Sequence, residues 1–504
     1  MHPLSENTKT VALLASVFVT GMAVLIIEIT ALRILSPYYG NTIYTTSSVI
    51  GVILAALSLG YYAGGKIADA RPHYALFYTI IFVAGLLVLL MDMISGGLLQ
   101  IFSAVFSIAA GSFFSALLLF FTPALLLGTL SPIAIKLQAN SLGRVGNSAG
   151  GVFFWSTLGS IVGTMLSGFF LIPMFGIAAI IVTTGIILGC LGLLGLLFFV
   201  PTNKKVLFVM VAVFAIIVAA VLLAQTMPIK SNLQTVYEKD GTYEKIKIAD
   251  GTWNGQPARF LFQDRSYSAA MYKNSDNLVY DYTKYYALYK LINPQATQAF
   301  AIGGGGYSIP KALLNDSPNM HVDVTEIEPE LYAAAKTYFN LPETDRLANY
   351  TEDGRRFLAK TNKTYDIIIG DAYYSFFSIP AHLTTKEFFT LAKTKLQDNG
   401  VFIGNFAGYL AQEKQSFILS EMRTFKNVFP NSYFFAVNSP NSDAAQNIIF
   451  LGINGTKKID FTNLKDLAQK NIDPNRFDFS KAQEITDDYA PVEYLVSKIL
   501  GHWY

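Results

Sequence analysis

Cysteine, the residue that forms disulfides and ligates many metal sites, is almost absent from this sequence. Its 504 residues include a single cysteine, Cys190, which lies inside an apolar run. One cysteine excludes a disulfide within the chain and a metal site that needs several cysteines, and we expect no metal cofactor. Charged residues make up 14% of the chain and the formal net charge is +2, so we expect no nucleic-acid partner.

Charge is scarce mainly in the first half of the chain, up to about Met227. The whole chain is 52% hydrophobic and has a mean hydropathy of +0.39, which is high for a soluble protein. We therefore predict that residues 1–227 form a membrane domain in the lipid bilayer and that a soluble half follows. The membrane domain contains about seven apolar runs, each near the roughly 20 residues that a bilayer requires. They lie near Val11–Leu35, Ser47–Gly65, Tyr74–Met91, Ser112–Ile135, Gly151–Ile172, Ala178–Val200 and Val206–Leu223.

Some residues inside the predicted spans bear on how the membrane domain packs and works. Glycines recur at four-residue spacing, as at Gly60 and Gly64, and small residues at this spacing allow close helix contacts in lipid. Glu28 is an acid within the first span. Because charges at membrane depth are costly and often functional, Glu28 is a functional candidate. The first span is too long for the apolar segment of a cleaved signal peptide.

The soluble half divides into a small β element and an α/β domain. Residues 228–283 contain a linker and alternating strands such as Lys245–Ile248, with a turn at Asn254-Gly255. Val279–Leu291 has the pattern of a helix rich in tyrosine. Residues 284–504 alternate between strand and helix patterns, which predicts a Rossmann-like domain with a mostly parallel sheet and helices on both faces.

The stretch from Ala299 to Glu328 predicts a nucleoside site. An apolar strand leads into the glycines Gly303–Gly306, a helix can begin at Ser308, and a second strand ends before the acid Glu326. Glycines let the backbone turn tightly and approach a ligand, which the amides at a helix N-terminus can then face. Ligands of open α/β sheets bind at the carboxyl ends of the strands, where an acid about 20 residues after the glycines can accept both hydroxyls of a ribose.

Two further acids follow predicted strands. Asp353, with Gly354 directly after it, lies near the end of the third strand and can accept a hydrogen bond from an adenine amino group. Asp371 follows the apolar run Ile367–Ile369, so we expect it in the same crevice. An isolated Asp in a loop is often a turn residue or a helix cap, but a place directly after a buried strand favours a role in the site.

Several motifs together resemble the spermidine synthase family. They are the glycine turn, TEIEPE, EDGRRF, YDIIIGDA, IPAHLTTKEFF and TDDYAPVE, and they extend over roughly Val236–Val492. Within the family, they resemble the branch whose catalytic-type domain is fused to a membrane half. The resemblance implies a small N-terminal β-domain on a Rossmann-like methyltransferase core. It also implies transfer of an aminopropyl group from decarboxylated S-adenosylmethionine to a diamine, with Gly303–Gly305 lining the nucleoside, Glu326 holding the ribose and Asp353 at the adenine.

Two positions depart from the pattern of the family. Soluble members read GGGDG at the glycine turn, where this chain has Gly306 in place of the acid, and DxxD after the fourth strand, where it has Asp371 and Tyr374. The second acid of DxxD is implied to deprotonate the attacking amine, so Asp371 and Tyr374 are the catalytic candidates here. Tyrosine, with an ordinary pKa of about 10, is a poor base, and a diamine needs a carboxylate at both ends. We therefore predict weak turnover of putrescine, with nucleoside binding retained.

The residues leave four functions open. These are aminopropyl transfer, transfer of a methyl or other group from S-adenosylmethionine to a non-diamine acceptor, a non-catalytic nucleoside or polyamine sensor, and a transporter with a degenerate soluble domain. Glu326 and Asp353 favour the first two, whereas the acids lost at Gly306 and Tyr374 favour the second and third. We take forward a spermidine synthase-like transferase that uses S-adenosylmethionine or its decarboxylated form and a small-molecule amine or other acceptor. The oligomeric state, a homo-oligomer included, stays open.

Loop charges predict an orientation in the membrane that conflicts with this cofactor. The second, fourth and sixth loops contain lysines and arginines, namely Lys66, Arg71, Lys136, Arg144, Lys204 and Lys205. Since positive loops face the cytoplasm, an odd number of spans places the soluble half outside it. A nucleoside cofactor made in the cytosol argues for the opposite side, and one span more or less reverses the orientation.

Overall fold

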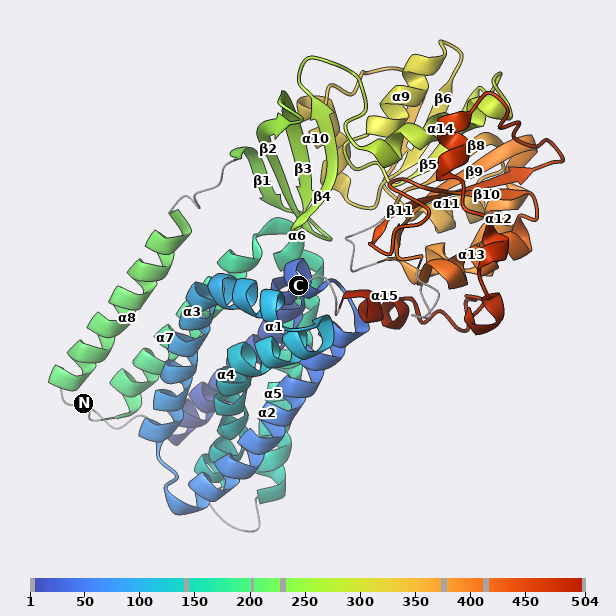
Figure 1. Cartoon of the computed structure of the whole chain (residues 1–504). Helices are drawn as coiled ribbons and strands as arrows, with labels where there is room; N and C mark the ends of the chain where they lie inside the picture. Colours follow the sequence, from blue (N-terminus) through green and yellow to red (C-terminus); the bar gives the residue numbers. More distant parts are fainter. Residues whose placement is uncertain are drawn as a thin grey trace. The chain divides into compact units, whose positions relative to one another are not determined.

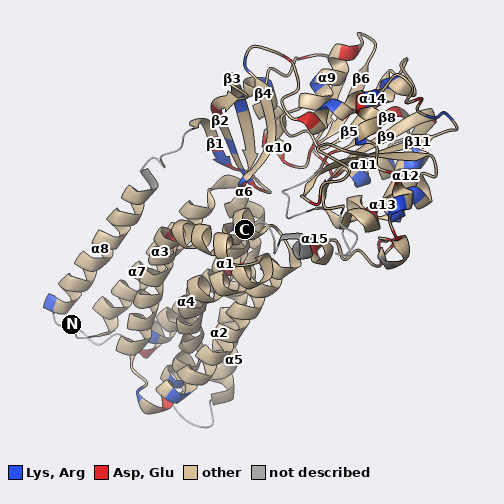
Figure 2. Cartoon of the chain, viewed as in Figure 1, with Lys and Arg blue, Asp and Glu red and all other residues tan. Residues whose placement is uncertain are grey.

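The structure is a computed structural model that describes residues 5–139, 145–200, 204–226, 233–372, 379–410 and 417–500. The chain divides into two compact units, Met1–Lys230 and Ser231–Tyr504 (Figure 1). Charged residues are rare in the helices of the first unit and frequent in the second (Figure 2).

The N-terminal unit is helical. Among the described residues, seven helices are long and apolar enough to cross a membrane. They are α1 (Glu6–Tyr39), α2 (Ile43–Ala70), α3 (Tyr74–Val105), α4 (Ile108–Gln138), α5 (Val145–Leu166) continued by a π turn and α6 (Ile172–Met174), α7 (Ile177–Phe199) and α8 (Lys204–Thr226). The prediction of a multi-span helical domain is thus confirmed. Several helices run further than their apolar runs, because hydropathy follows the bilayer whereas a helix ends where its backbone is capped.

Glycines bring the backbones of α2 and α4 into direct contact, as their four-residue spacing predicted. A Cβ atom at Gly60 would lie 2.4 Å from the carbonyl oxygen of Leu125, and one at Gly64 would lie 2.5 Å from that of Thr129. Both distances are shorter than a van der Waals contact, so a side chain at either position requires the helices to separate. Glu28 lies on α1 at intermediate exposure, and a functional role for it stays a prediction.

A small antiparallel sheet opens the C-terminal unit. Its strands are β1 (Gln234–Asp240), β2 (Lys245–Trp253), β3 (Gln256–Gln263) and β4 (Ser266–Tyr272), in that order across the sheet. β2 and β3 are joined at Asn254 and Gly255, whose φ angles of 49° and 77° are those of a tight hairpin turn. The predicted β element and its Asn-Gly turn are therefore confirmed.

The larger sheet has seven strands in the order β10-β11-β9-β8-β5-β6-β7. The pairs from β9 to β7 are parallel, and β11 and β10 add antiparallel strands at one edge. The strands are β5 (Gln298–Ile302), β6 (His321–Thr325), β7 (Leu347–Tyr350), β8 (Tyr365–Gly370), β9 (Leu396–Gly408), β10 (Ser432–Ala436) and β11 (Gln446–Asn454). The helices are α9 (Ser308–Asp316), α10 (Pro329–Tyr338), α11 (Gly354–Lys360), α12 (Lys386–Thr394), α13 (Phe417–Val428), α14 (Lys465–Lys470) and α15 (Val492–Leu500). The Rossmann-like fold with a mostly parallel sheet is thus confirmed.

The tyrosine-rich segment before this sheet, where the sequence predicted a helix at Val279–Leu291, is the 3-10 helix Asp281–Leu291. In a 3-10 helix, side chains three residues apart lie above one another. Tyr286 and Tyr289 are spaced in this way, and their ring centroids lie 6.5 Å apart. Both hydroxyls donate to Asp316 on α9, at 3.1 and 2.9 Å, so these two tyrosines attach the 3-10 helix to α9.

Candidate active site

A cavity of about 190 Å³ lies at the carboxyl ends of the parallel strands. Its walls include every described residue that the sequence proposed for the site. These are Gly303, Gly304, Gly305, Gly306, Glu326, Asp353, Gly354 and Asp371. They come from the ends of β5, β6, β7 and β8, which pair side by side, and this explains why residues far apart in sequence meet here. The other catalytic candidate, Tyr374, lies outside the described residues.

The glycine turn connects β5 to α9. Gly303 and Gly305 have positive φ angles of 91° and 50°, which glycine adopts without strain. A Cβ at Gly303 would lie 2.4 Å from the carbonyl oxygen of Asp371, so the turn passes directly against the end of β8. Gly306 is buried, and a Cβ there would lie 2.8 Å from the Cβ of Ala269 on β4. An acid at position 306 therefore has no room in this arrangement of the two segments.

Glu326 lies beneath the glycine turn and holds it in place. Its Oε2 accepts hydrogen bonds from the amides of Gly304 and Gly305, at 2.9 and 3.0 Å, and its Oε1 accepts from the amide of Glu328 at 3.0 Å. Burial raises the pKa of Glu326, although these amides oppose the shift. A carboxylate offers about four acceptor positions, so a ribose with two hydroxyls has to displace part of this contact.

Asp353 caps the N-terminus of α11 and faces a histidine. Its Oδ1 accepts from the amide of Arg356 at 2.8 Å, and its Oδ2 lies 2.8 Å from Nε2 of His382. Burial acts to raise the pKa of Asp353, but the contacts with His382 and the Arg356 amide outweigh it and lower the pKa. The carboxylate therefore stays ionised and remains an acceptor.

Asp371 is surrounded by neutral hydrogen-bond donors. Its Oδ1 accepts from Nδ2 of Asn405 at 3.0 Å, and the hydroxyl of Tyr282 also donates to it. Asn405 is itself held by Asn447, whose Nδ2 donates to its side-chain oxygen at 2.9 Å. Burial raises the pKa of Asp371 to about 6, against the opposing effect of these hydrogen bonds. A carboxylate with this pKa can accept a proton near neutral pH, as a general base requires.

Two acids of the described lining were not predicted as site residues, namely Glu352, which directly precedes Asp353, and Glu244. Glu244 lies in the connection between β1 and β2, and its Oε1 accepts a hydrogen bond from Nε2 of Gln263. Ser268 donates in turn to the side-chain oxygen of Gln263. A charged residue at the start of a half-buried strand was the available signal, but nothing in the sequence places that strand against the glycine turn.

The described lining of the cavity is acidic. It contains the acidic side chains of Glu244, Glu326, Glu352, Asp353 and Asp371. The only residue of basic type among the described lining residues is His382, and none is a lysine or arginine. Such a cavity is suited to a ligand that carries positive charge.

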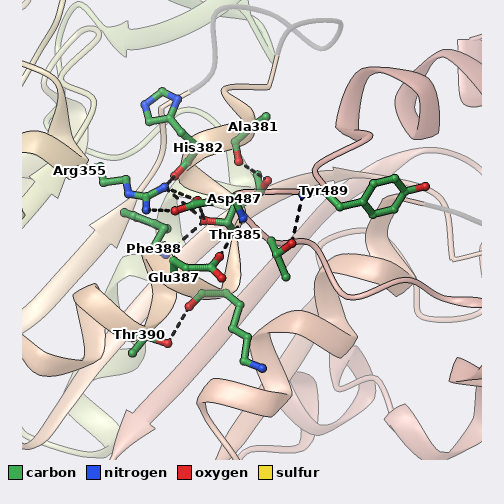
Figure 3. A network of polar contacts seen from close by, with 12 residues as sticks. Arg355, Ala381, His382, Thr385, Glu387, Phe388, Thr390, Asp487 and Tyr489 are labelled. Atoms are coloured by element: carbon green, nitrogen blue, oxygen red, sulfur yellow. Dashed lines mark hydrogen bonds and ion pairs between the residues drawn. The ribbon is translucent and has the colours of Figure 1, made fainter.

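A polar network fixes the loop that carries His382 (Figure 3). Arg355 on α11 donates to both carboxylate oxygens of Asp487, at 2.7 and 2.5 Å, and to the carbonyl oxygen of His382 at 3.0 Å. Thr385 donates to the same Asp487 carboxylate at 2.8 Å, and the Asp487 amide donates to Glu387 at 2.9 Å. The TDDY segment near the C-terminus thus ties the loop to α11 and α12, beside Asp353.

Comparisons with known proteins bear on the C-terminal unit. Residues 288–463 match the family model described as the spermine/spermidine synthase domain. A polyamine aminopropyltransferase of Vibrio vulnificus is 31% identical over 151 residues, which cover 29% of this chain and 48% of the relative. One from Streptococcus uberis is 28% identical over 176 residues, covering 34% and 60%. An N-terminal histidine N-methyltransferase of Emericella nidulans is 31% identical over 147 residues, covering 28% and 24%.

The chain spans about half the length of the Vibrio vulnificus relative, at 48%. Solved structures with similarity include a probable spermidine synthase from Corynebacterium glutamicum, with a TM-score of 0.44, 18% identity, and coverage of 52% of this chain and 97% of that one. Human methyltransferase-like protein 13 in complex with SAH has a TM-score of 0.32 and 24% identity, with coverage of 38% and 90%.

Proposed function

We propose that this chain, whose C-terminal part carries a spermine/spermidine synthase domain at residues 288–463, transfers an aminopropyl group from decarboxylated S-adenosylmethionine to an amine. The family resemblance predicted from the motifs is confirmed by that match. Residues 1–227 are proposed as a membrane domain that anchors the enzyme in a bilayer, 228–283 as a linker and small β-domain, and 284–504 as the transferase domain.

The observation that supports this function best is the charge of the cavity. Its described lining has five acidic side chains, those of Glu244, Glu326, Glu352, Asp353 and Asp371, and no lysine or arginine. The decarboxylated donor carries a sulfonium and an ammonium and no negative charge. Intact S-adenosylmethionine also carries a carboxylate, which would be desolvated here without a basic partner. The lining therefore favours the decarboxylated form.

In the proposed reaction, Asp371 accepts a proton from the ammonium of the acceptor. The freed amine nitrogen attacks the methylene carbon next to the sulfonium, a new C–N bond forms and the C–S bond breaks. The electron pair of the broken bond remains on sulfur, and the nucleoside leaves as a neutral thioether. Asn405 and Tyr282 keep the carboxylate of Asp371 oriented through their hydrogen bonds, and the glycine turn holds the nucleoside at the end of β8.

Methyl transfer from intact S-adenosylmethionine is the second candidate. It is supported by the relative from Emericella nidulans, whose printed name is that of a histidine N-methyltransferase. It requires a place for the carboxylate of the donor, and the acidic lining among the described residues weighs against it.

Mass spectrometry of reactions of the detergent-solubilised full chain tests these alternatives. Each donor is incubated with a panel of amines, and the released nucleoside and the modified amine are identified. We expect methylthioadenosine and an aminopropylated amine from the decarboxylated donor. A methylated product formed only from the intact donor would refute aminopropyl transfer and support the second candidate.

The same reactions test the acceptor class. Among the described residues of the cavity, Asp371 is the acid next to Tyr282 and Asn405, and residues 373–378 contain no acid. The second ammonium of a diamine therefore lacks a carboxylate partner on this side. We expect the rate of transfer to putrescine to exceed the rate to butylamine by less than about tenfold. A charge pair with the second ammonium would be worth roughly that factor, and it is missing here. A preference of a hundredfold or more would contradict the assignment.

A further inference from the structure

Glu244 has an unusual position for an acid that serves only the fold. Glu244 is 3% exposed, and among the described residues its Oε2 is buried without a hydrogen-bond partner. An unpaired buried polar oxygen destabilises the fold, and more so when the group is charged. The acid also lines the cavity, where a cation that reached it would supply the partner that this oxygen lacks.

The groups around Glu244 are acids and neutral side chains. Asp264, Glu326 and Glu328 act on it electrostatically, and the amide of Gln263 donates to its other oxygen. Burial, followed by these like charges, raises the pKa of Glu244 well above its ordinary range. Glu244 therefore holds a proton more readily than an ordinary glutamic acid does, and an approaching cation favours its ionised form.

The position of Glu244 relative to the glycine turn indicates which cation it meets. A Cβ at Gly305 would lie 3.6 Å from Oγ of Ser268 and 4.0 Å from Oε1 of Gln263, the two residues that lead to Glu244. At the other end of the turn, Gly303 abuts Asp371. The turn is therefore flanked by two acids, one at the end of β8 and one from the small β-sheet.

We propose that Glu244 binds the primary ammonium of the aminopropyl chain of the donor and so selects a decarboxylated nucleoside. This inference rests on the proposed function, because it assigns the nucleoside to the turn and the acceptor to Asp371. The ammonium supplies the partner that Oε2 lacks. A carboxylate on the same chain, as in intact S-adenosylmethionine, would instead meet Glu244 and Glu326 as like charges.

The test measures binding, so it does not depend on turnover. Isothermal titration calorimetry of the full chain in detergent compares the sulfide analogue of the donor, adenosine joined through sulfur to propylamine, with methylthioadenosine, which lacks the ammonium. We expect the wild-type chain to prefer the amine-bearing sulfide by about 10- to 100-fold, the value of one charge-assisted hydrogen bond. Glu244→Gln keeps an acceptor for Gln263 and removes the charge, so the preference should fall below about threefold while the affinity for methylthioadenosine is unchanged.

Two further measurements complete the test. In the wild-type chain at neutral pH, titrations in buffers of different ionisation enthalpy should show net proton release on binding the sulfide and none on binding methylthioadenosine. Glu238→Gln, an exposed acid on β1, is the matched control and should keep both the preference and the proton release. A preference that survives in Glu244→Gln, an equal loss of affinity for both nucleosides, or no proton release by the wild-type chain would each overturn the assignment. Failure of aminopropyl transfer would leave these binding results intact and refute only the proposed reaction.

Discussion

At the scale of single residues, the burial of Asp371 bears both on its proposed role as a base and on the stability of the folded protein. Burial raises its pKa to about 6, while Asn405 and Tyr282 stabilise the ionised form through hydrogen bonds. A group of this kind takes up a proton readily, and it also destabilises the folded protein when it is charged. Both consequences can be measured on one substitution, Asp371→Asn.

The first prediction concerns rate. Because Asp371 must be ionised to accept a proton, kcat of the wild-type chain should fall about tenfold per unit as the pH drops below about 6. Asp371→Asn should lower kcat by at least about 100-fold, remove this limb and leave the affinity for methylthioadenosine within about twofold. Undiminished transfer by the variant would show that another group is the base.

The second prediction concerns stability. The pKa of about 6 in the folded state lies above the ordinary value of 3.8, so the folded chain binds this proton more tightly than the unfolded chain. The resulting stabilisation is present below about pH 4 and is lost as the pH rises through about 6. Asp371→Asn should therefore raise the free energy of unfolding by up to about 3 kcal/mol at pH 8 and by little at pH 4. Melting curves of the full chain check this, with the exposed Asp443→Asn as control, and an equal effect at both pH values would contradict it.

The residues of the cavity differ in how far sequence could reveal them. Glu326, Asp353 and Asp371 each follow a strand of a parallel sheet, so topology alone brings them to one edge. Glu244 follows no such rule, because it reaches the cavity through contacts between the small β-sheet and the glycine turn. Long-range packing of this kind is not encoded in a local pattern.

At the scale of elements, the segment Thr486–Tyr489 holds the loop that carries His382 in place through hydrogen bonds. Asp487 joins Arg355 of α11 to Thr385 at the start of α12, and the same arginine donates to the carbonyl of His382 (Figure 3). The loop lines the cavity next to Asp353. Its position therefore depends on a residue more than a hundred positions away in the chain.

The third prediction follows from these hydrogen bonds of Asp487. Asp487→Asn removes the charge of an ion pair whose side chains, those of Arg355 and Asp487, are 24% and 42% exposed. The interaction that holds the loop should therefore weaken by about 1 kcal/mol and not more. We expect the KM for the donor to rise about fivefold with kcat nearly unchanged. Asp488→Asn, the exposed neighbour, should have no effect in the same steady-state assay. Equal effects of the two substitutions would remove the role given to Asp487.

The fourth prediction uses two adjacent glycines of α2. A Cβ at Gly64 would lie 2.5 Å from a backbone oxygen of α4, whereas a Cβ at Gly65 has no atom within 4 Å. Gly64→Val should destabilise the helical unit by about 1–3 kcal/mol, and Gly65→Val should be near neutral. The two variants are compared by their melting temperatures in detergent and by the fraction of each that remains monodisperse. Similar melting temperatures for both variants would show that α2 and α4 pack less closely at Gly64 than this distance indicates.

Elements were predictable where their pattern is local. The apolar runs, the Asn-Gly hairpin and the glycine turn each carry their own signal, and each is found in the structure. The helix predicted at Val279–Leu291 is found as the 3-10 helix Asp281–Leu291, a type that the apolar pattern does not specify. Strands β10 and β11 were not predicted, since they complete the sheet by antiparallel pairing outside the βαβ pattern.

At the scale of the whole molecule, the division into an apolar helical unit and a charged α/β unit follows from composition (Figures 1 and 2). The side of the membrane does not follow from it, because orientation depends on the number of spans and on a few loop charges. Seven described helices are long enough to span a membrane. If the even loops are cytoplasmic, that number of spans predicts a C-terminal unit outside the cytoplasm.

The fifth prediction tests this orientation by labelling in intact cells. In a Cys190→Ser background, Lys204→Cys, at the start of α8 directly after the sixth loop, should resist a membrane-impermeant thiol reagent. Asn41→Cys in the first loop, which is exposed, should react. Labelling of Lys204→Cys with protection of Asn41→Cys would reverse the orientation and place the C-terminal unit in the cytosol.

The acidic lining of the cavity also bears on what happens after the chemical step. In the proposed reaction the donor enters with two positive charges, on sulfur and on nitrogen, and the spent nucleoside leaves with neither. The five acidic side chains of the described lining therefore attract the substrate and have no comparable hold on the thioether. Release of the by-product is then driven by the loss of charge itself, so methylthioadenosine should inhibit turnover only weakly and the cavity is cleared for the next donor.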